Sequence, residues 1–100
     1  MSANLLKETI DILQEHNKTL ADVEWFGTYD YEITSEQFIT LADVIYDNGY
    51  GGAEVLSNLL VVGNGWWLER GEYDGSEWWD YKECPSRPSE TKQVSSLLYD

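Results

Sequence analysis

Hydrophobic residues recur at helical spacing near the beginning of the chain. Residues 4–16 carry an apolar stripe on one face and acidic side chains on the opposite face, and this arrangement predicts an amphipathic helix. The stripe consists of Leu6, Ile10 and Leu13. Residues 22–29 follow with β-branched and aromatic side chains, which favour a β-strand.

A second helix is expected to begin at Thr34. Gln37 follows three residues later and completes the capping-box pattern of a helix N-terminus. The helix should end between residues 47 and 52, because Asn48-Gly49 and the two glycines after it tolerate the positive φ of a C-cap and turn. Its predicted apolar face comprises Phe38, Leu41, Ala42 and Ile45.

Short apolar and aromatic runs alternate with turn signals in the C-terminal half of the chain. Asn64-Gly65 and Asp74-Gly75 are both strong signals for type I′ hairpin turns. They predict a three-stranded antiparallel meander with strands at residues 58–63, 66–73 and 76–83. The expected fold class is therefore α+β, with two helices packed on a small antiparallel sheet.

The length of 100 residues allows one domain with a modest core. We expect this domain to span residues 1–84 and residues 85–100 to form a weakly structured tail. The single Cys84 cannot form an internal disulfide, which fits a reducing compartment. The chain has neither the start of a signal peptide nor an apolar run near the roughly 20 residues of a membrane span. A cytoplasmic location is the expectation.

Two-residue turns would fix the register of the predicted meander, so that Arg70 faces Trp79. Arg70 can then lie over Trp79 in a cation–π contact and reach Glu72 or Glu77. Side chains alternate along each strand, and one face of the sheet should therefore pack against the helices. The apolar residues on that face are Leu59, Val61, Trp66, Leu68, Trp79 and Tyr81.

The opposite face of the predicted meander carries Trp67 and Trp78, with Glu69 and Asp80 directly across from each other. Like charges that face each other across a ladder are destabilising unless another group binds or neutralises them. Two interpretations stay open. Either the pair has no function, because the carboxylates splay into water or Lys82 shields Asp80, or this face is an acidic surface flanked by Trp that meets a partner.

The charge of the chain narrows the range of partners. The sequence has 19 Asp and Glu against 6 Lys and Arg, a formal net charge of −13, and no basic residue between Lys18 and Arg70. This balance excludes nucleic-acid binding through a basic patch and attraction to an anionic membrane. The aromatic content of 14% excludes a disordered acidic tail.

The predicted second helix would arrange part of this charge in a row. Glu36, Asp43 and Asp47 would stack on its outward face, about 6 and 10 Å apart, which resembles a nucleic-acid backbone. A domain of this length has a diameter of about 34 Å, and duplex DNA of that length carries roughly 20 charges. The net charge is of the same order. The alternative is that the acidity only confers solubility.

Nucleophilic catalysis and metal binding find little support in the sequence. His16 is most simply a surface residue near the C-terminus of the first helix, and Cys84 is a structural or edge thiol far from it in sequence. The acidic residues that alternate from residue 30 fail the calcium-loop pattern, because Ser35 and Leu41 occupy the positions that need Gly and Glu. No Cys and His cluster offers a zinc site. We expect no enzyme activity, no cofactor and no metal.

Two segments of the sequence carry a resemblance to a known group of proteins. Residues 66–82, WWLERGEYDGSEWWDYK, together with residues 42–52, ADVIYDNGYGG, resemble a family of small phage and mobile-element proteins. The resemblance covers about residues 20–85. Small acidic phage proteins include anti-CRISPR and anti-restriction inhibitors, several of which act as DNA mimics in the nucleic-acid groove of a nuclease. The resemblance implies a similar inhibitor in the host cytoplasm, without a catalytic motif.

The functional expectation is a phage-type acidic inhibitor that binds the basic nucleic-acid-binding surface of a host defence nuclease, such as a CRISPR effector. It would contact neither nucleic acid nor a membrane directly. Two alternatives stay open for the Trp-bearing face, namely binding of a carbohydrate or small molecule, or formation of a structural homodimer. The residues expected to bind the partner are Glu36, Asp43, Asp47, Glu69, Glu72, Asp74, Glu77, Asp80, Trp67 and Trp78.

Overall fold

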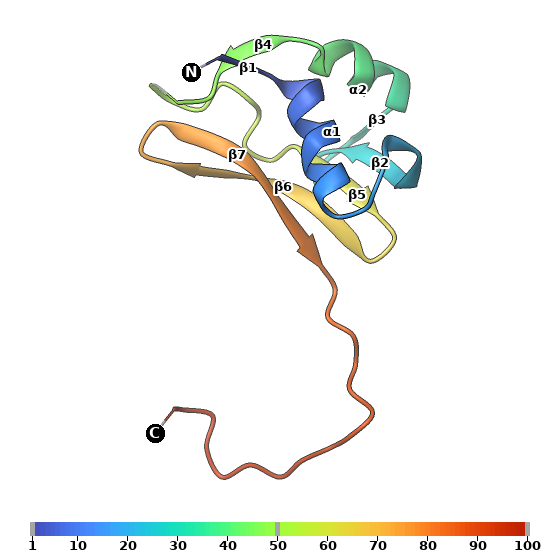
Figure 1. Ribbon diagram of the computed structural model, residues 1–100, viewed down its shortest axis with the longest axis vertical. Helices are drawn as coiled ribbons and strands as arrows, with labels where there is room; N and C mark the ends of the chain where they lie inside the picture. Colours follow the sequence, from blue (N-terminus) through green and yellow to red (C-terminus); the bar gives the residue numbers. More distant parts are fainter. Residues whose placement is uncertain (1, 50, 100) are drawn as a thin grey trace.

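The computed structural model describes residues 2–49 and 51–99 and has the predicted α+β architecture. Five antiparallel strands form one sheet in the order β3-β2-β5-β6-β7, and β1 and β4 form a separate pair. Helix α1 lies against the sheet, with α2 and the β1–β4 pair at one end of the molecule (Figure 1). The elements are β1 (Ser2–Asn4), α1 (Leu5–Glu15), the 3₁₀ turn η1 (Leu20–Asp22), β2 (Val23–Gly27), β3 (Glu32–Ile33), α2 (Ser35–Ala42), β4 (Ile45–Asp47), β5 (Leu60–Gly63), β6 (Trp66–Tyr73) and β7 (Ser76–Glu83).

Helix α1 confirms the first predicted helix but turns a different face to the core. Its fully buried residues are Leu5, Thr9 and Leu13, whereas the predicted stripe residues Leu6 and Ile10 are only half-buried. Thr9 tolerates burial because its hydroxyl donates to the carbonyl of Leu5 at 2.8 Å. The same hydroxyl oxygen accepts the indole N–H of Trp79 at 2.9 Å, which anchors the helix to β7.

Helix α2 begins as predicted and ends earlier than predicted. Thr34 and Gln37 form the capping box, in which the Thr34 hydroxyl accepts the Gln37 backbone N–H at 3.1 Å. The helix ends at Ala42, and the chain then extends into β4, where Tyr46 pairs with Ala3 of β1. This pairing overrides the helical apolar pattern, so Ile45, predicted to face the core, is 64% exposed.

The segment after β4 is consequently a turn and not the predicted C-cap of a helix. Within it, the backbone carbonyl of Asn48 accepts the N–H of Glu77 at 2.9 Å. Gly51 lies close to Gly75 at the tip of the β6–β7 hairpin. The segment therefore joins the β4 end of the molecule to the hairpin. Tyr50 lies outside the described residues.

The C-terminal meander agrees with the predicted strands and register. Arg70 faces Trp79 and Glu69 faces Asp80, as expected. The β6–β7 turn has positive φ at both Asp74 and Gly75, at 50° and 84°, as a type I′ turn requires. In the β5–β6 turn only Gly65 has positive φ, so the prediction of type I′ geometry there is wrong.

The core lies between the sheet and the two helices. The predicted face of the meander supplies five buried side chains, and Tyr81 at its end is half-buried. His16 at the C-terminus of α1 stacks on the Tyr81 ring at 3.7 Å between centroids, so it is only partly a surface residue. The two helices, β2 and β4 complete the core with Leu5, Leu13, Phe26, Phe38, Ala42 and Tyr46.

Residues 85–99 form neither helix nor strand and are exposed. They leave the body at the end of β7, away from the end that carries α2 and β4 (Figure 1). This extended tail raises the radius of gyration to 16.8 Å, above the roughly 13 Å of a compact chain of this length. Among the described residues, no helix is long and apolar enough to cross a membrane.

Candidate interaction surfaces

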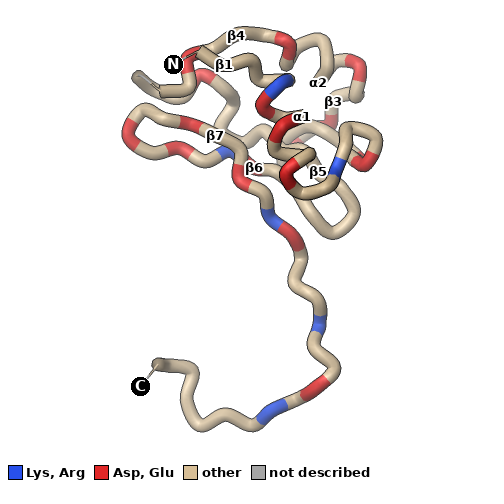
Figure 2. The backbone as a smooth tube through the Cα atoms, in the orientation of Figure 1, with Lys and Arg blue, Asp and Glu red and all other residues tan. Residues whose placement is uncertain are grey.

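The folded domain carries the whole net charge of the protein. Residues 1–84 contain 17 of the 19 acidic and four of the six basic residues, so the tail is neutral in sum. Figure 2 shows acidic positions distributed around the body and few basic ones among them. A net charge of this size acts on charged partners from a distance.

Each of the four basic side chains in the domain already has an intramolecular partner. Lys7 and Lys82 lie on the surface, and the Arg70 side chain is only 3% exposed. The domain therefore offers little positive charge to its surroundings. The four contacts are Lys7–Asp11 at 2.8 Å, Arg70–Glu77 at 3.0 Å, Lys82–Glu69 at 3.9 Å and Lys18 at 5.9 Å from the centroid of the Trp66 ring.

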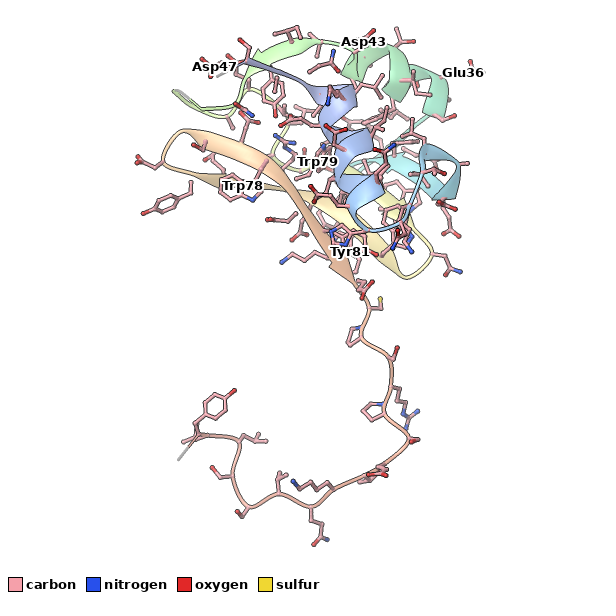
Figure 3. All side chains as sticks on the ribbon, viewed as in Figure 1. Glu36, Asp43, Asp47, Trp78, Trp79 and Tyr81 are labelled. Atoms are coloured by element: carbon pink, nitrogen blue, oxygen red, sulfur yellow. The ribbon has the colours of Figure 1, made fainter. Side chains whose placement is uncertain are left out.

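Glu36, Asp43 and Asp47 do not stack on one helix, because α2 ends before two of them. Glu36 lies in the first turn of α2, Asp43 is its C-cap and Asp47 belongs to β4. The carboxylate of Asp43 accepts the side-chain N–H of Asn4 at 2.9 Å. The three residues nevertheless lie along one edge of the molecule in Figure 3, which we call the acidic edge.

Of the site residues predicted on the β6–β7 hairpin, some are exposed and one is buried. Glu72 and Asp74 are exposed at the hairpin tip. Glu77 is only 4% exposed, because it lies on the core face of β7 and pairs with Arg70. Its assignment to a partner-binding surface is therefore wrong, whereas its predicted contact with Arg70 is confirmed.

The facing carboxylates of Glu69 and Asp80 are each satisfied by an indole. Trp67 donates its ring N–H to Glu69 at 3.1 Å, and Trp78 donates to Asp80 at 2.8 Å. Lys82 lies 3.9 Å from the carboxylate of Glu69, whereas the sequence had predicted that it would shield Asp80. These contacts relieve the like-charge pair and fix the orientation of two aromatic rings on the sheet surface.

A glycine makes room for one of these rings. A Cβ atom at Gly71 would lie 2.5 Å from the Nε1 atom of Trp78 and 2.6 Å from a carboxylate oxygen of Asp80. The Trp78 indole therefore packs directly on the backbone of β6, with 38% of the residue exposed (Figure 3).

The same face of the sheet extends to residues that the sequence did not single out. Trp25 of β2 pairs with Val62 of β5, which places it beside Trp67. Strand pairing between β2 and β5 has no local signal, so these aromatic neighbours were missed. We call the surface around Trp67 and Trp78 the outer face. Its shallow pocket of about 200 Å³ is lined by Trp25, Tyr29, Leu60, Val62 and Trp67.

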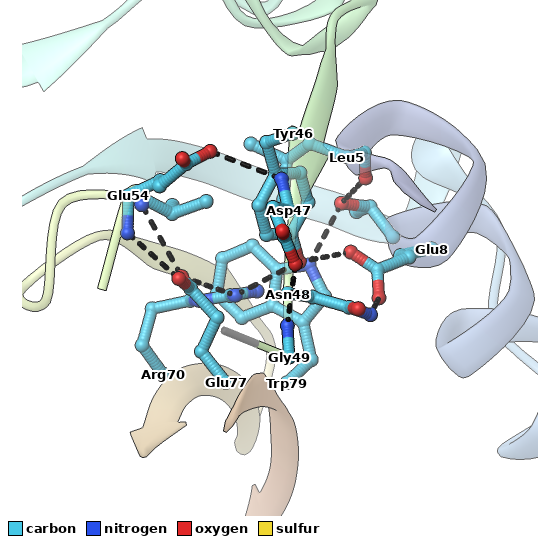
Figure 4. A network of polar contacts seen from close by, with 12 residues as sticks. Leu5, Glu8, Tyr46, Asp47, Asn48, Gly49, Glu54, Arg70, Glu77 and Trp79 are labelled. Atoms are coloured by element: carbon cyan, nitrogen blue, oxygen red, sulfur yellow. Dashed lines mark hydrogen bonds and ion pairs between the residues drawn. The ribbon is translucent and has the colours of Figure 1, made fainter. Parts of the chain in front are cut away.

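A buried polar network lies beneath the hairpin, on the opposite side from the outer face (Figure 4). The Arg70 guanidinium donates to Glu77 at 3.0 Å and to the Tyr46 hydroxyl at 3.1 Å, and it lies 4.7 Å from the centroid of the Trp79 ring. Glu77 also accepts the backbone N–H groups of Glu54 and Val55, at 2.7 and 3.2 Å. The network ties the hairpin to β4 and to the segment before β5.

Helix α1 joins this network through Glu8. The Tyr46 hydroxyl donates to one Glu8 oxygen, and the Asn48 side-chain N–H donates to the other at 3.3 Å. Burial, with a further contribution from the Glu8 hydrogen bond, raises the pKa of Tyr46 to about 12. The hydroxyl therefore stays protonated as a donor. These contacts hold four elements together, and no nucleophile with an adjacent base takes part in them.

No group of three or more His, Cys, Asp or Glu residues in the described part of the chain is arranged to hold a metal ion. Cys84 is exposed at the end of the sheet and has no disulfide. Comparison of the chain with protein-family models, curated proteins and solved structures finds no match.

Proposed function

We propose that the protein is a non-enzymatic acidic inhibitor that docks on the basic nucleic-acid-binding surface of another protein, with a host defence nuclease such as a CRISPR effector as the specific target. The observation that carries this proposal is the concentration of the whole charge of −13 in a domain whose four basic residues are already engaged. Such a surface attracts lysine- and arginine-lined grooves and accelerates association with them.

The proposed contact residues lie in two exposed groups. The acidic edge supplies Glu36 and Asp43, and the hairpin tip supplies Glu72 and Asp74. The two shorter dimensions of the molecule are 32 and 27 Å, which is close to the length of one turn of duplex DNA, about 34 Å, with its roughly 20 phosphate charges. The outer face, with its oriented Trp78, lies next to the hairpin tip and can supply an aromatic anchor for the complex.

The test compares three variants that each lose two negative charges. If the proposal holds, neutralising the acidic edge or the hairpin tip weakens inhibition of target-DNA binding about three- to tenfold, while the control changes it little. The readout is binding of labelled duplex DNA by purified CRISPR effector nucleases. The variants are Glu36→Gln/Asp43→Asn at the edge, Glu72→Gln/Asp74→Asn at the tip and the control Glu15→Gln/Glu24→Gln.

Salt dependence provides the second readout. Binding by charge neutralisation should weaken steeply between about 50 and 200 mM salt, as protein–DNA binding does. An affinity that hardly changes over this range contradicts mimicry. If all three variants lose inhibition equally, and polyglutamate inhibits DNA binding as well as the protein does, the acidity confers solubility only.

The outer face supports a second candidate function, binding of a carbohydrate. Trp67 and Trp78 are held in place by Glu69 and Asp80, and a fixed indole beside a carboxylate offers a sugar both a stacking surface and a hydrogen-bond acceptor. Titration with oligosaccharides should then quench Trp fluorescence saturably, and Trp78→Ala should abolish the effect. Absence of saturable quenching excludes this function.

A further inference from the structure

An apolar groove lies between α2, β4 and the segment before β5, and none of the surfaces described above includes it. Its volume is about 390 Å³. Buried side chains such as Phe38 and Leu59 form its floor. Its rim consists of exposed apolar residues, namely Leu41, Val44, Ile45 and Leu56, which are 67%, 49%, 64% and 57% exposed. Contiguous apolar surface of this kind marks an interaction site.

The end of the chain carries apolar side chains of matching character. Within the segment Val94–Tyr99, both leucines and the tyrosine are more than 80% exposed, and Val94 is 63% exposed. Four large apolar side chains exposed to water on one short segment are unfavourable unless they bury their surface in a contact. We propose that this segment of one copy docks into the groove of a second copy, and that reciprocal docking produces a two-fold dimer.

Charge complementarity favours this pairing. Asp43, Asp47 and Glu54 lie beside the groove, on the elements that form it. The tail contributes Arg87 and Lys92 just before its apolar segment, and neither forms an ion pair within the described part of the chain. A tail lying in the groove therefore brings the only basic residues outside the domain toward its acidic edge.

The position of the tail favours a second copy over the same chain. The tail leaves the body at the end of β7, on the side away from α2 and β4 (Figure 1). The linker of residues 84–93 spans at most about 35 Å when fully extended, and the body measures 32 by 27 Å across its shorter axes. Returning to its own groove would demand a nearly extended path around the body. Pro85 and Pro88 further stiffen the linker.

The tail brings a sizeable apolar area to the contact. Its four large side chains bury roughly 400 Å² per tail, so two reciprocal contacts bury about 800 Å² of tail surface, to which the groove residues that they cover add. Specific interfaces bury about 1,200–2,000 Å² in total.

The oligomeric state of the full-length chain tests the proposal. Sedimentation equilibrium should show twice the monomer mass of 11.5 kDa for the wild-type protein. Replacing the tail leucines, Leu97→Ser/Leu98→Ser, or the rim residue, Leu41→Ser, should weaken the dimer at least about tenfold. Ile39→Ser is the matched control, because Ile39 is 41% exposed on the same helix but does not line the groove.

A mixture of the tail variant with the Leu41→Ser variant contains one intact tail for each intact groove. Dimerisation should therefore be partly restored in the mixture, which no general effect on folding explains. Circular dichroism of each variant confirms that it is folded.

Other outcomes overturn the proposal in distinguishable ways. A wild-type monomer whose binding of an apolar dye increases in the tail variant indicates that the tail occupies its own groove. If the wild-type protein is a monomer and dye binding is unchanged in the tail variant, the tail does not occupy the groove at all. A dimer that survives the tail and groove variants but is lost in Trp78→Ala uses the outer face instead.

Discussion

Arg70 is the residue on which the interior of this protein depends most. Removing a charge from water has a penalty of several kcal/mol, and its partners must offset this penalty. Glu77 supplies the opposite charge, and the Trp79 ring lies against the guanidinium at 4.7 Å. Glu77 in turn accepts two backbone N–H groups from the segment before β5. One carboxylate thus accepts three hydrogen bonds, two from the segment before β5 and one from β6.

Loss of that carboxylate should therefore be severe. Glu77→Ala leaves a buried guanidinium unpaired and two N–H groups without an acceptor, and we expect it to lower the free energy of unfolding by about 3–5 kcal/mol. Urea denaturation measures the change. Glu72→Ala is the control, because Glu72 faces Glu77 across the ladder but is exposed. Similar values for the two variants contradict the assigned role of Glu77.

The Tyr46 hydroxyl gives the network a dependence on alkaline pH. Its pKa of about 12 in the folded protein exceeds the ordinary value of about 10, so the folded state holds this proton more tightly than the unfolded state. Its stabilising contribution is complete below pH 10 and is lost as the pH rises from about 10 to about 12. Tyr46→Phe should remove this part of the pH dependence.

Spectrophotometric titration of tyrosinate checks the same prediction directly. The step with the highest pKa should disappear in Tyr46→Phe and persist in Tyr29→Phe, whose side chain is exposed. A high-pH step that both variants retain would assign the raised pKa to another tyrosine.

At the scale of elements, most local patterns predicted the observed structure, whereas the long-range strand pairings could not be predicted. The capping box at Thr34 and the turn at Asp74-Gly75 depend on neighbouring residues, so the beginning of α2 and the register of the hairpin could be predicted. The early end of α2 depends on Ser2–Asn4, which pairs with β4 from more than forty residues away. No pattern within residues 34–47 reveals that partner.

The same distinction applies to the candidate site. The register placed Glu69 and Asp80 opposite each other correctly, since two-residue turns leave no other pairing. The same register places Glu77 on the core face, which indicates burial and conflicts with the prediction that Glu77 binds a partner. The aromatic neighbour Trp25 could not be predicted, because β2 joins the sheet through the distant β5.

The N-terminal cap of helix α2 can be tested by substitution. The helix has only eight residues, so its N-cap contributes a large share of its stability. Thr34→Ala should lower the free energy of unfolding by about 1 kcal/mol, because the Gln37 N–H loses its acceptor. Thr40→Ala on the exposed side of the same helix should change it by less than about 0.5 kcal/mol in thermal or urea unfolding. Equal effects would show that capping is not the cause.

At the scale of the whole molecule, the large net negative charge opposes folding. A domain with 17 acidic and four basic residues repels itself, and the repulsion is lost when the chain unfolds. Added salt screens it over about 10 Å at 0.1 M. The free energy of unfolding should therefore rise with salt at neutral pH, and less steeply in Glu15→Gln/Glu24→Gln. Stability that is independent of salt would mean that the carboxylates are too dispersed to repel one another.

The neutral tail has a practical consequence for handling the protein. Residues 85–100 contain two acidic and two basic residues, so proteolysis at the exposed linker removes at most about one net charge. Intact and clipped molecules would then bind an anion-exchange column almost equally and leave it together. Mass spectrometry separates them, and a preparation judged pure by ion exchange alone can contain both.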